Sequence, residues 1–183
     1  MENRVSRRFS PEYALLGFLY QAPSHGYELH QRLREQLGFI WNASQSQTYN
    51  ILKRLESQGY IQAVDVKQDK HPKRRQIQLT SSGNERFISW LNLPTKPSVH
   101  AIRLEFITRL YFHQLYFPEK APKMIHDQLE ILRVDVRRLQ QQLKKIEDQQ
   151  SINKQALGLR LELLSSMERW LEGCCETNTT EHL

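Results

Sequence analysis

The chain has 183 residues, of which 25% are charged, and a formal net charge of +6, which is typical of a folded rather than a disordered protein. It has no apolar stretch near the roughly 18 residues that cross a bilayer, and its arginine-rich beginning is unlike a secretory signal. The two cysteines, Cys174 and Cys175, are adjacent and do not make a disulfide framework. We therefore expect a cytoplasmic protein without membrane contact.

The positive charge is concentrated in the first half of the chain. Residues 1–91 hold 13 lysines and arginines against 8 acidic residues, whereas the remainder holds 13 against 12. A basic module joined to an electrically balanced one indicates that the first binds a polyanion and that the second has another task.

Three short helices are predicted within the first sixty residues. The first begins at Ser10–Glu12, and the second follows Ser24, whose side chain is a candidate cap, with leucines at helical spacing. The third begins at Ser44, where a serine followed three residues later by Gln47 forms a capping box. This helix runs to about Gln58, and the following Gly59 is suited to a helix C-terminal cap.

After the third helix the pattern changes to that of strands. Residues 61–66 are rich in β-branched side chains, and residues 76–79 alternate polar and apolar with a period of two. A polar, basic stretch with a proline lies between them and predicts a β-hairpin with a long tip. A fourth helix is expected from Thr80 to about Leu91.

The second half of the chain is predicted to be all helix. Pro94 and Pro97 interrupt the chain, so we predict a first domain at 1–91, a linker at 92–97 and a second domain at 98–183. In the long helix that follows, apolar residues recur alternately four and three apart, as in a coiled coil. An intramolecular helical bundle is the alternative to a homodimer. The predicted dimerisation residues are Ile125, Leu129, Leu132, Val136, Leu139, Leu143, Ile146, Leu161 and Leu164.

Three helices followed by a basic hairpin form a winged helix-turn-helix, in which the third helix enters the major groove of DNA. The predicted fold is therefore mainly α with a small β-hairpin wing, followed by an all-α, coiled-coil-like dimerisation domain. One face of the third helix is apolar, and the opposite face carries small or polar side chains suited to bases and phosphates. The candidate DNA contacts on this helix are Ser46, Gln47, Tyr49, Asn50, Lys53 and Arg54. Those in the wing are Lys67, Lys70, His71, Lys73, Arg74 and Arg75.

Four segments resemble the PadR family of transcriptional regulators in order and spacing: residues 14–19, 23–29, 47–61 and 79–83. The second contains the sequence HGYEL, and the resemblance covers roughly residues 12–91. It implies a dimeric repressor or activator that binds double-stranded DNA and often answers to a small molecule. The second half resembles only the type of helical dimerisation domain that larger members carry.

The resemblance also implies roles for individual residues. Tyr49 matches the family's recognition-helix tyrosine, expected at the DNA backbone, and Tyr27 matches the tyrosine that opens the second helix. His25 and Tyr27 are therefore further candidate DNA contacts. The chain departs from the family pattern at Asn50–Ile51, where many members carry proline or another small residue. This difference affects which DNA sequence we expect the protein to prefer, but not the expectation that it binds DNA.

A second class of function stays open, a winged-helix adaptor whose coiled coil binds a protein partner. Such an adaptor needs neither a basic wing nor a polar outer face on the third helix, and both features favour DNA binding instead. The seven histidines are scattered, and no nucleophile or phosphate-loop motif is present, so we expect no metal, no cofactor and no enzymatic activity. Trp90 and Tyr111 are candidates for lining an effector pocket, the alternative being an aromatic core at the domain junction.

Overall fold

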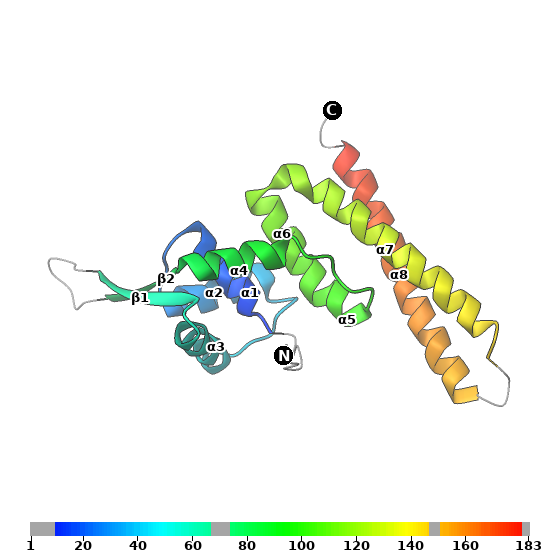
Figure 1. Ribbon diagram of the computed structural model, residues 1–183, viewed down its shortest axis with the longest axis horizontal. Coiled ribbons are helices and arrows are strands. Elements are labelled where there is room, and N and C mark those ends of the chain that lie inside the picture. Colours follow the sequence, from blue (N-terminus) through cyan, green and yellow to red (C-terminus); the bar gives the residue numbers. More distant parts are fainter. Residues whose placement is uncertain (1–9, 67–73, 147–150, 181–183) are drawn as a thin grey trace. The chain divides into compact units, whose positions relative to one another are not determined.

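Figure 1 shows a computed structural model of the chain, which describes residues 10–66, 74–146 and 151–180. The chain divides into two compact units, Met1–Leu93 and Pro94–Leu183. Both units are mainly helical, and the strands in the described ranges form one small antiparallel sheet, which confirms the predicted fold class. No helix in those ranges is both long and apolar enough to span a membrane.

Unit 1 begins with three helices, α1 (Glu12–Gln21), α2 (Gly26–Leu37) and α3 (Gln45–Ser57). The predicted capping box at the start of α3 is confirmed. The Ser44 hydroxyl accepts the N–H of Gln47 at 3.2 Å, and the Gln47 side chain accepts the N–H of Ser44 at 2.8 Å. Both bonds satisfy backbone donors that the first turn of a helix leaves without partners, so the start of α3 is defined locally.

The wing is an antiparallel hairpin of β1 (Ile61–Val66) and β2 (Arg74–Leu79), whose register pairs Ile61 with Leu79. The two strands extend side by side from the helical part of unit 1 (Figure 1). Gly59 connects α3 to β1 with a φ of +74°, a left-handed conformation that glycine adopts without steric cost. Helix α4 (Ser81–Leu91) follows, capped by the predicted Thr80, whose hydroxyl accepts the N–H of Gly83.

The start of α2 differs from the sequence-based expectation, because His25 rather than Ser24 is the capping residue. The His25 side chain accepts from the backbone of Glu28, and the Glu28 carboxylate accepts the N–H of His25 at 2.9 Å. The backbone N–H and C=O of Ser24 are both paired with Ile77 of β2, at 3.0 and 2.9 Å. This bridge ties Ser24 to the sheet, so the helix begins one residue later.

The core of unit 1 is formed where α1, α2, α3 and α4 meet. Helix α1 is apolar on nearly every side and buries residues 14–19, while α2 and α3 each contribute a single stripe. The fully enclosed side chains include Leu15, Leu16, Phe18, Leu29, Leu33, Leu55 and Phe87. Because α3 packs with one face on this core, its other face is left for solvent or a ligand.

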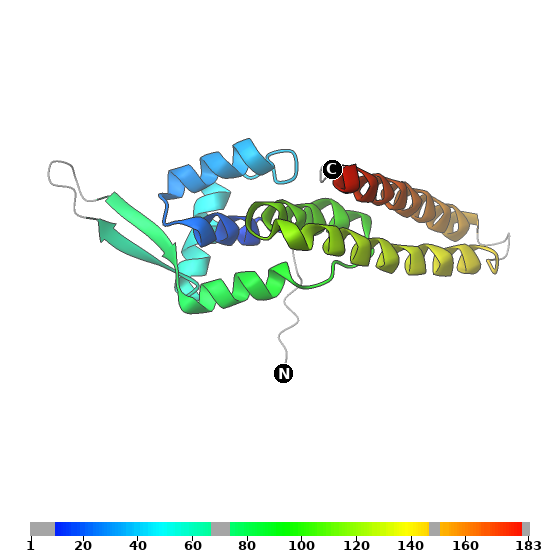
Figure 2. The same ribbon diagram turned by 90° about the horizontal axis from the view of Figure 1, so that it is seen from above.

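Unit 2 consists of one interrupted helix followed by a long antiparallel pair. The first part comprises α5 (Val99–Ala101), a π-helical turn η1 (Ile102–Phe106) and α6 (Ile107–Tyr116). A short 3-10 turn, η2 (Pro118–Lys120), leads into α7 (Ala121–Leu143), and α8 (Ser151–Thr180) completes the chain. Helices α7 and α8 lie side by side in both views (Figure 1, Figure 2).

The heptad seam predicted for dimerisation is covered within the chain. Ile125, Leu129, Leu132, Val136 and Leu139 are all buried in one cluster with Leu164 and Leu171 of α8. Leu161 packs partly buried against the same cluster, and Leu143 and Ile146 are half-buried. The spacing therefore describes how α7 contacts α8, and a role of these residues in a homodimer stays a prediction.

Candidate nucleic-acid interface

Helix α3 separates its residues into two faces, as the sequence predicts. Thr48, Ile51, Leu52 and Leu55 are its buried residues. The exposed residues include five of the six predicted DNA contacts on the opposite side, Ser46, Gln47, Tyr49, Asn50 and Lys53. The exposed face therefore offers small, amide, phenol and ammonium groups, which are the groups that read base edges and bind phosphates.

The sixth predicted contact, Arg54, is also exposed but is held by α1. Its guanidinium forms an ion pair with the Glu12 carboxylate at 2.7 Å, and Arg86 of α4 binds the other oxygen of Glu12 at 2.6 Å. Arg86 also lies over the Tyr60 ring, 4.3 Å from its centre. Glu12 thus joins α1, α3 and α4 and holds the Arg54 guanidinium in place, while a contact of Arg54 with DNA stays a prediction. No local sequence pattern connects Glu12 with Arg86, which is 74 residues away, so neither residue was predicted as part of the site.

The start of α2 forms a hydrogen-bonded cluster around Glu28. Its carboxylate accepts the backbone N–H of His25 and the Ser24 hydroxyl at 2.9 Å each, and the Tyr27 hydroxyl at 3.0 Å. These donors, the His25 N–H first, hold the pKa of Glu28 below its ordinary value. The His25 and Tyr27 rings stack with their centres 5.9 Å apart. In this arrangement the Tyr27 hydroxyl donates within the cluster.

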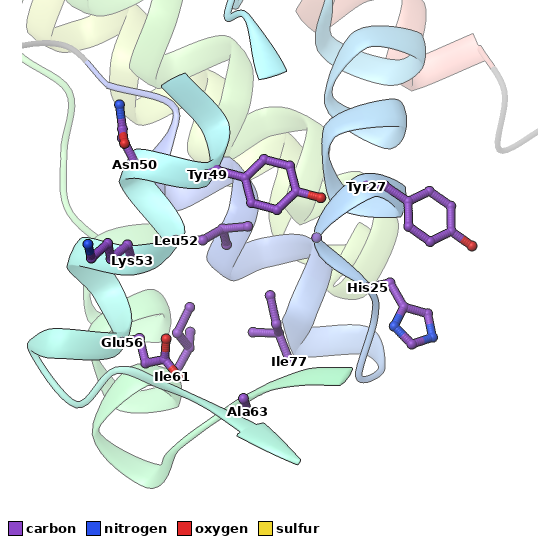
Figure 3. Close-up of a pocket in the computed structure, with 11 residues that line it drawn as sticks. His25, Tyr27, Tyr49, Asn50, Leu52, Lys53, Glu56, Ile61, Ala63 and Ile77 are labelled. Carbon is purple, nitrogen blue, oxygen red and sulfur yellow. The ribbon is translucent and has the colours of Figure 1, made fainter. Parts of the chain in front are cut away.

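Tyr49 has a different environment from Tyr27. Its side chain is 44% exposed, and it forms no hydrogen bond within residues 10–66, 74–146 and 151–180. The Tyr49 ring extends from α3 towards the first turn of α2, where it lies against Gly26 (Figure 3). A Cβ atom added to Gly26 would be 3.0 Å from Cε1 of the ring and 3.4 Å from its hydroxyl. The missing side chain of Gly26 therefore leaves the space in which the ring lies.

A hydrogen bond also joins α2 to the start of α3. His30 Nδ1 lies 3.0 Å from the Thr48 hydroxyl, and that hydroxyl donates to the carbonyl of Ser44 at 3.2 Å. Because the single hydroxyl hydrogen is used towards Ser44, Nδ1 is the donor to Thr48. His30 thus has a structural role, because it links α2 to α3. Within the described ranges, no three His, Cys, Asp or Glu side chains are grouped so that they could hold a metal ion.

A hollow of about 810 Å³ opens between α3, the first turn of α2 and the hairpin (Figure 3). Leu52, Ile61, Ala63 and Ile77 provide apolar lining, and Tyr49 forms one wall. The polar groups of the lining come from His25, Tyr27, Asn50, Lys53 and Glu56. This hollow could not be predicted from the sequence, because its lining comes from residues 25–27, 49–56, 61–63 and 77, which share no local pattern.

The remaining predicted site residues are those of the wing and the two aromatic residues Trp90 and Tyr111. Lys67, Lys70, His71 and Lys73 fall outside the described residues, and Arg74 and Arg75 begin β2 opposite Val66 and Asp65. Their contacts with DNA stay predictions. Trp90 stacks on Tyr13 in unit 1 with ring centres 4.5 Å apart, and Tyr111 contacts Phe112 in unit 2. An effector pocket lined by Trp90 and Tyr111 also stays a prediction.

Comparison with known proteins relates this chain to transcriptional regulators. Residues 15–88 match the model of the transcriptional regulator PadR-like family. The negative transcriptional regulator PadR of Bacillus subtilis is 28% identical over 170 residues, covering 88% of this chain and 93% of the relative.

Two crystal structures of Bacillus subtilis PadR are similar to the chain at 26% identity. The complex with operator DNA covers 91% of this chain and 96% of that one, with a TM-score of 0.44. The complex with p-coumaric acid covers 91% and 97%, with a TM-score of 0.41.

Proposed function

We propose that the chain is a regulator of the transcriptional regulator PadR-like family, whose model matches residues 15–88, and that it binds an inverted-repeat operator as a homodimer. It acts as a repressor or activator in the cytoplasm, where the operator is. The observation that carries the proposal is the division of α3 into a buried apolar face and an exposed polar face beside Tyr49. A helix that is supported on one side and polar on the other is what major-groove reading requires.

Each exposed group on α3 has a role suited to its chemistry. The Asn50 amide can form a bidentate pair with adenine, and the Lys53 ammonium suits guanine or a phosphate. Since the Gln47 side-chain oxygen is used in the capping box, its NH₂ group is the part that reaches a base acceptor. Tyr49, whose hydroxyl no described residue binds, donates to a backbone phosphate.

The homodimer is supported by an uncovered apolar stripe on α8. Ile152, Leu159, Leu163 and Trp170 are 72%, 59%, 43% and 45% exposed. They are spaced seven, four and seven residues apart, and because each residue turns a helix by about 100°, they lie along one line. A second copy that places the same stripe against this one buries all four side chains on both chains. Its two-fold symmetry gives two copies of α3 for two half-sites.

The test is binding of the full chain to DNA from upstream of its own gene, measured by fluorescence anisotropy against a scrambled duplex over a salt series. We expect preference for the upstream DNA and an affinity that falls steeply with salt, because each phosphate contact releases condensed counterions. Absence of binding even at low salt would contradict the proposal. It would favour the adaptor alternative, in which the helices bind a protein partner.

A prediction concerns the contact between Gly26 and Tyr49. Replacing Gly26 with valine should displace the Tyr49 ring and weaken operator binding by about tenfold, the value of one hydrogen bond to a charged group. Gly26→Ala, to which the ring can adapt by a few tenths of an ångström, should lie between valine and the wild type. Both variants are measured by anisotropy, with thermal melting to verify that unit 1 stays folded.

Two controls make this measurement specific. Tyr49→Phe should lose about as much affinity as Gly26→Val, and the double variant should lose no more than either, because both changes remove the same contact. Gly173→Ala on α8, where a Cβ meets nothing within 4 Å, should bind DNA like the wild type. Wild-type affinity in Gly26→Val would show that the position of the ring does not matter.

A further inference from the structure

Glu12, Arg54 and Arg86 form an ion-pair bridge between three helices of unit 1, called the Glu12 bridge below. The Glu12 Oε2 atom accepts from Arg54 of α3 at 2.7 Å, and its Oε1 atom accepts from Arg86 of α4 at 2.6 Å. Only 16% of the Glu12 side chain is exposed, so water screens these pairs less than it screens pairs on an open surface. One carboxylate of α1 thus holds two guanidinium groups at the same time.

The Arg86 end of the bridge is held by aromatic rings as well as by Glu12. Its guanidinium lies 4.3 Å from the centre of the Tyr60 ring and 5.4 Å from the centre of the Tyr13 ring. The backbone N–H of Tyr60 donates to the carbonyl of Leu55 at 3.0 Å, which ties Tyr60 to the last turn of α3. Arg86 of α4 therefore contacts α1 directly and the end of α3 through Tyr60.

The bridge supplies a directional contact that the apolar core does not. Helix α1 packs on both α3 and α4, and it does so with a largely apolar surface. Hydrophobic contact is non-directional, whereas charge-assisted hydrogen bonds require a particular distance and angle. The core therefore holds the three helices together, and the Glu12 bridge limits how far α3 can shift or rotate on α1.

The two kinds of DNA contact expected on α3 respond differently to such a shift. A bidentate pair between Asn50 and a base edge needs its heavy atoms within about 2.7–3.2 Å, so a displacement of about 1 Å breaks it. The attraction between Lys53 and phosphates acts over about 8–10 Å, the screening length at ordinary salt concentrations, and tolerates the same displacement. Accurate placement of α3 therefore matters more for preference among DNA sequences than for DNA binding in general.

We propose that Glu12 is a positioning residue for DNA recognition, which fixes α3 on α1 and α4 so that its polar face can distinguish the operator from other DNA. This rests on the proposed function, since it assigns Glu12 to the specificity of that function. Glu12 acts without touching DNA, because each of its oxygens binds an arginine of unit 1. A carboxylate also repels phosphates, so general affinity for DNA does not account for its place beside α3.

The experiment compares the full chain with its Glu12→Gln variant, using duplex DNA from upstream of its own gene and a scrambled duplex in the same buffer. We expect the affinity for the upstream duplex to fall at least about tenfold, the value of one base contact. The affinity for the scrambled duplex should stay the same or rise, because the substitution removes a negative charge and releases Arg54. Loss of folding lowers both affinities, so opposite responses distinguish a displaced α3 from an unfolded unit 1.

Two further variants make the measurement specific. Glu85→Gln is the matched control, since it makes the same change in net charge at an exposed position of α4, and it should keep the wild-type ratio of the two affinities. Arg86→Met breaks the bridge from the other end. It should lower that ratio about as much as Glu12→Gln, and the double variant should lower it no further, because both changes remove the same link.

The outcomes separate this proposal from the proposed function. A folded Glu12→Gln protein with the wild-type ratio would overturn the positioning role and leave the proposed function in place. Equal losses of affinity for both duplexes would also overturn it, because Glu12 would then serve only the stability of unit 1. If Glu12→Gln fails to fold by circular dichroism, Glu12→Asp, which keeps the charge on a shorter side chain, replaces it with the same expected fall in the ratio. A wild type without preference for the upstream duplex would overturn the proposed function and this proposal with it.

Discussion

Replacing Gly83 with alanine is expected to lower the free energy of unfolding of unit 1 by about 3 kcal/mol, at the upper end of the cost of overpacking. Gly83 is buried in the first turn of α4, where an added Cβ would overlap the carbonyl oxygen of Tyr60 and lie 2.9 Å from its carbon. These are backbone atoms, so no side chain can turn aside to make room. Either α4 or the start of β1 must move.

The movement would also break the contacts that fasten α4 to the preceding turn. The Thr80 hydroxyl accepts the N–H of Gly83 and donates to the carbonyl of Gly59 at 2.6 Å, and the Ser82 hydroxyl donates to the same carbonyl at 3.0 Å. A shift of α4 lengthens these bonds together. The decrease in the free energy of unfolding should therefore exceed that caused by a surface substitution, which is usually within about 0.5 kcal/mol.

Chemical denaturation followed by circular dichroism measures this effect. The matched control is Gly158→Ala on α8, where a Cβ meets nothing within 4 Å. That variant should be stabilised by up to about 1 kcal/mol, because alanine favours a helix interior more than glycine does. A Gly83→Ala protein within about 1 kcal/mol of the wild type would contradict the close packing of α4 on Tyr60.

Replacing Leu163 with glutamate is expected to convert the dimer to a monomer and to weaken operator binding by about 100-fold or more. Leu163 lies in the middle of the apolar stripe of α8, between Leu159 and Trp170. In a two-fold dimer each substitution occurs twice, so two carboxylates enter one apolar interface. A monomer contacts one half-site only, and it loses the second set of phosphate and base contacts.

Analytical ultracentrifugation gives the oligomeric state, and anisotropy gives the affinity for the operator. Arg169→Glu is the control, since it places the same carboxylate at an exposed position of the same helix, about 100° around the axis from the stripe. It should remain dimeric and bind normally. A Leu163→Glu protein that stays dimeric would exclude the stripe as the interface, and a monomer with wild-type affinity would contradict the two-fold reading of the operator.

The sequence alone determined the features that depend on neighbouring residues. The period of α3 predicts that Thr48, Ile51, Leu52 and Leu55 face inward, and the structure confirms this. The capping box at Ser44 is likewise predicted correctly. In these cases the interacting groups are three or four residues apart, so helix geometry brings them together without help from the rest of the fold.

Tertiary structure decided which surfaces those elements meet. The heptad pattern of α7 requires an apolar partner but does not identify it, and in the structure that partner is α8 of the same chain. His25 caps α2 because a backbone bridge to Ile77 holds Ser24 in place, and that bridge forms only once the sheet is in position.

The candidate site shows the same division between local and distant contacts. Glu12 binds Arg54 and Arg86, which are 42 and 74 residues away, and Tyr49 rests on Gly26, 23 positions earlier. Local propensities do not reveal such pairs, because the residues approach each other only when α1, α2, α3 and α4 pack around their common core. The sequence therefore determined which residues of α3 form its exposed polar face, and packing determined how that face is held and what lies beside it.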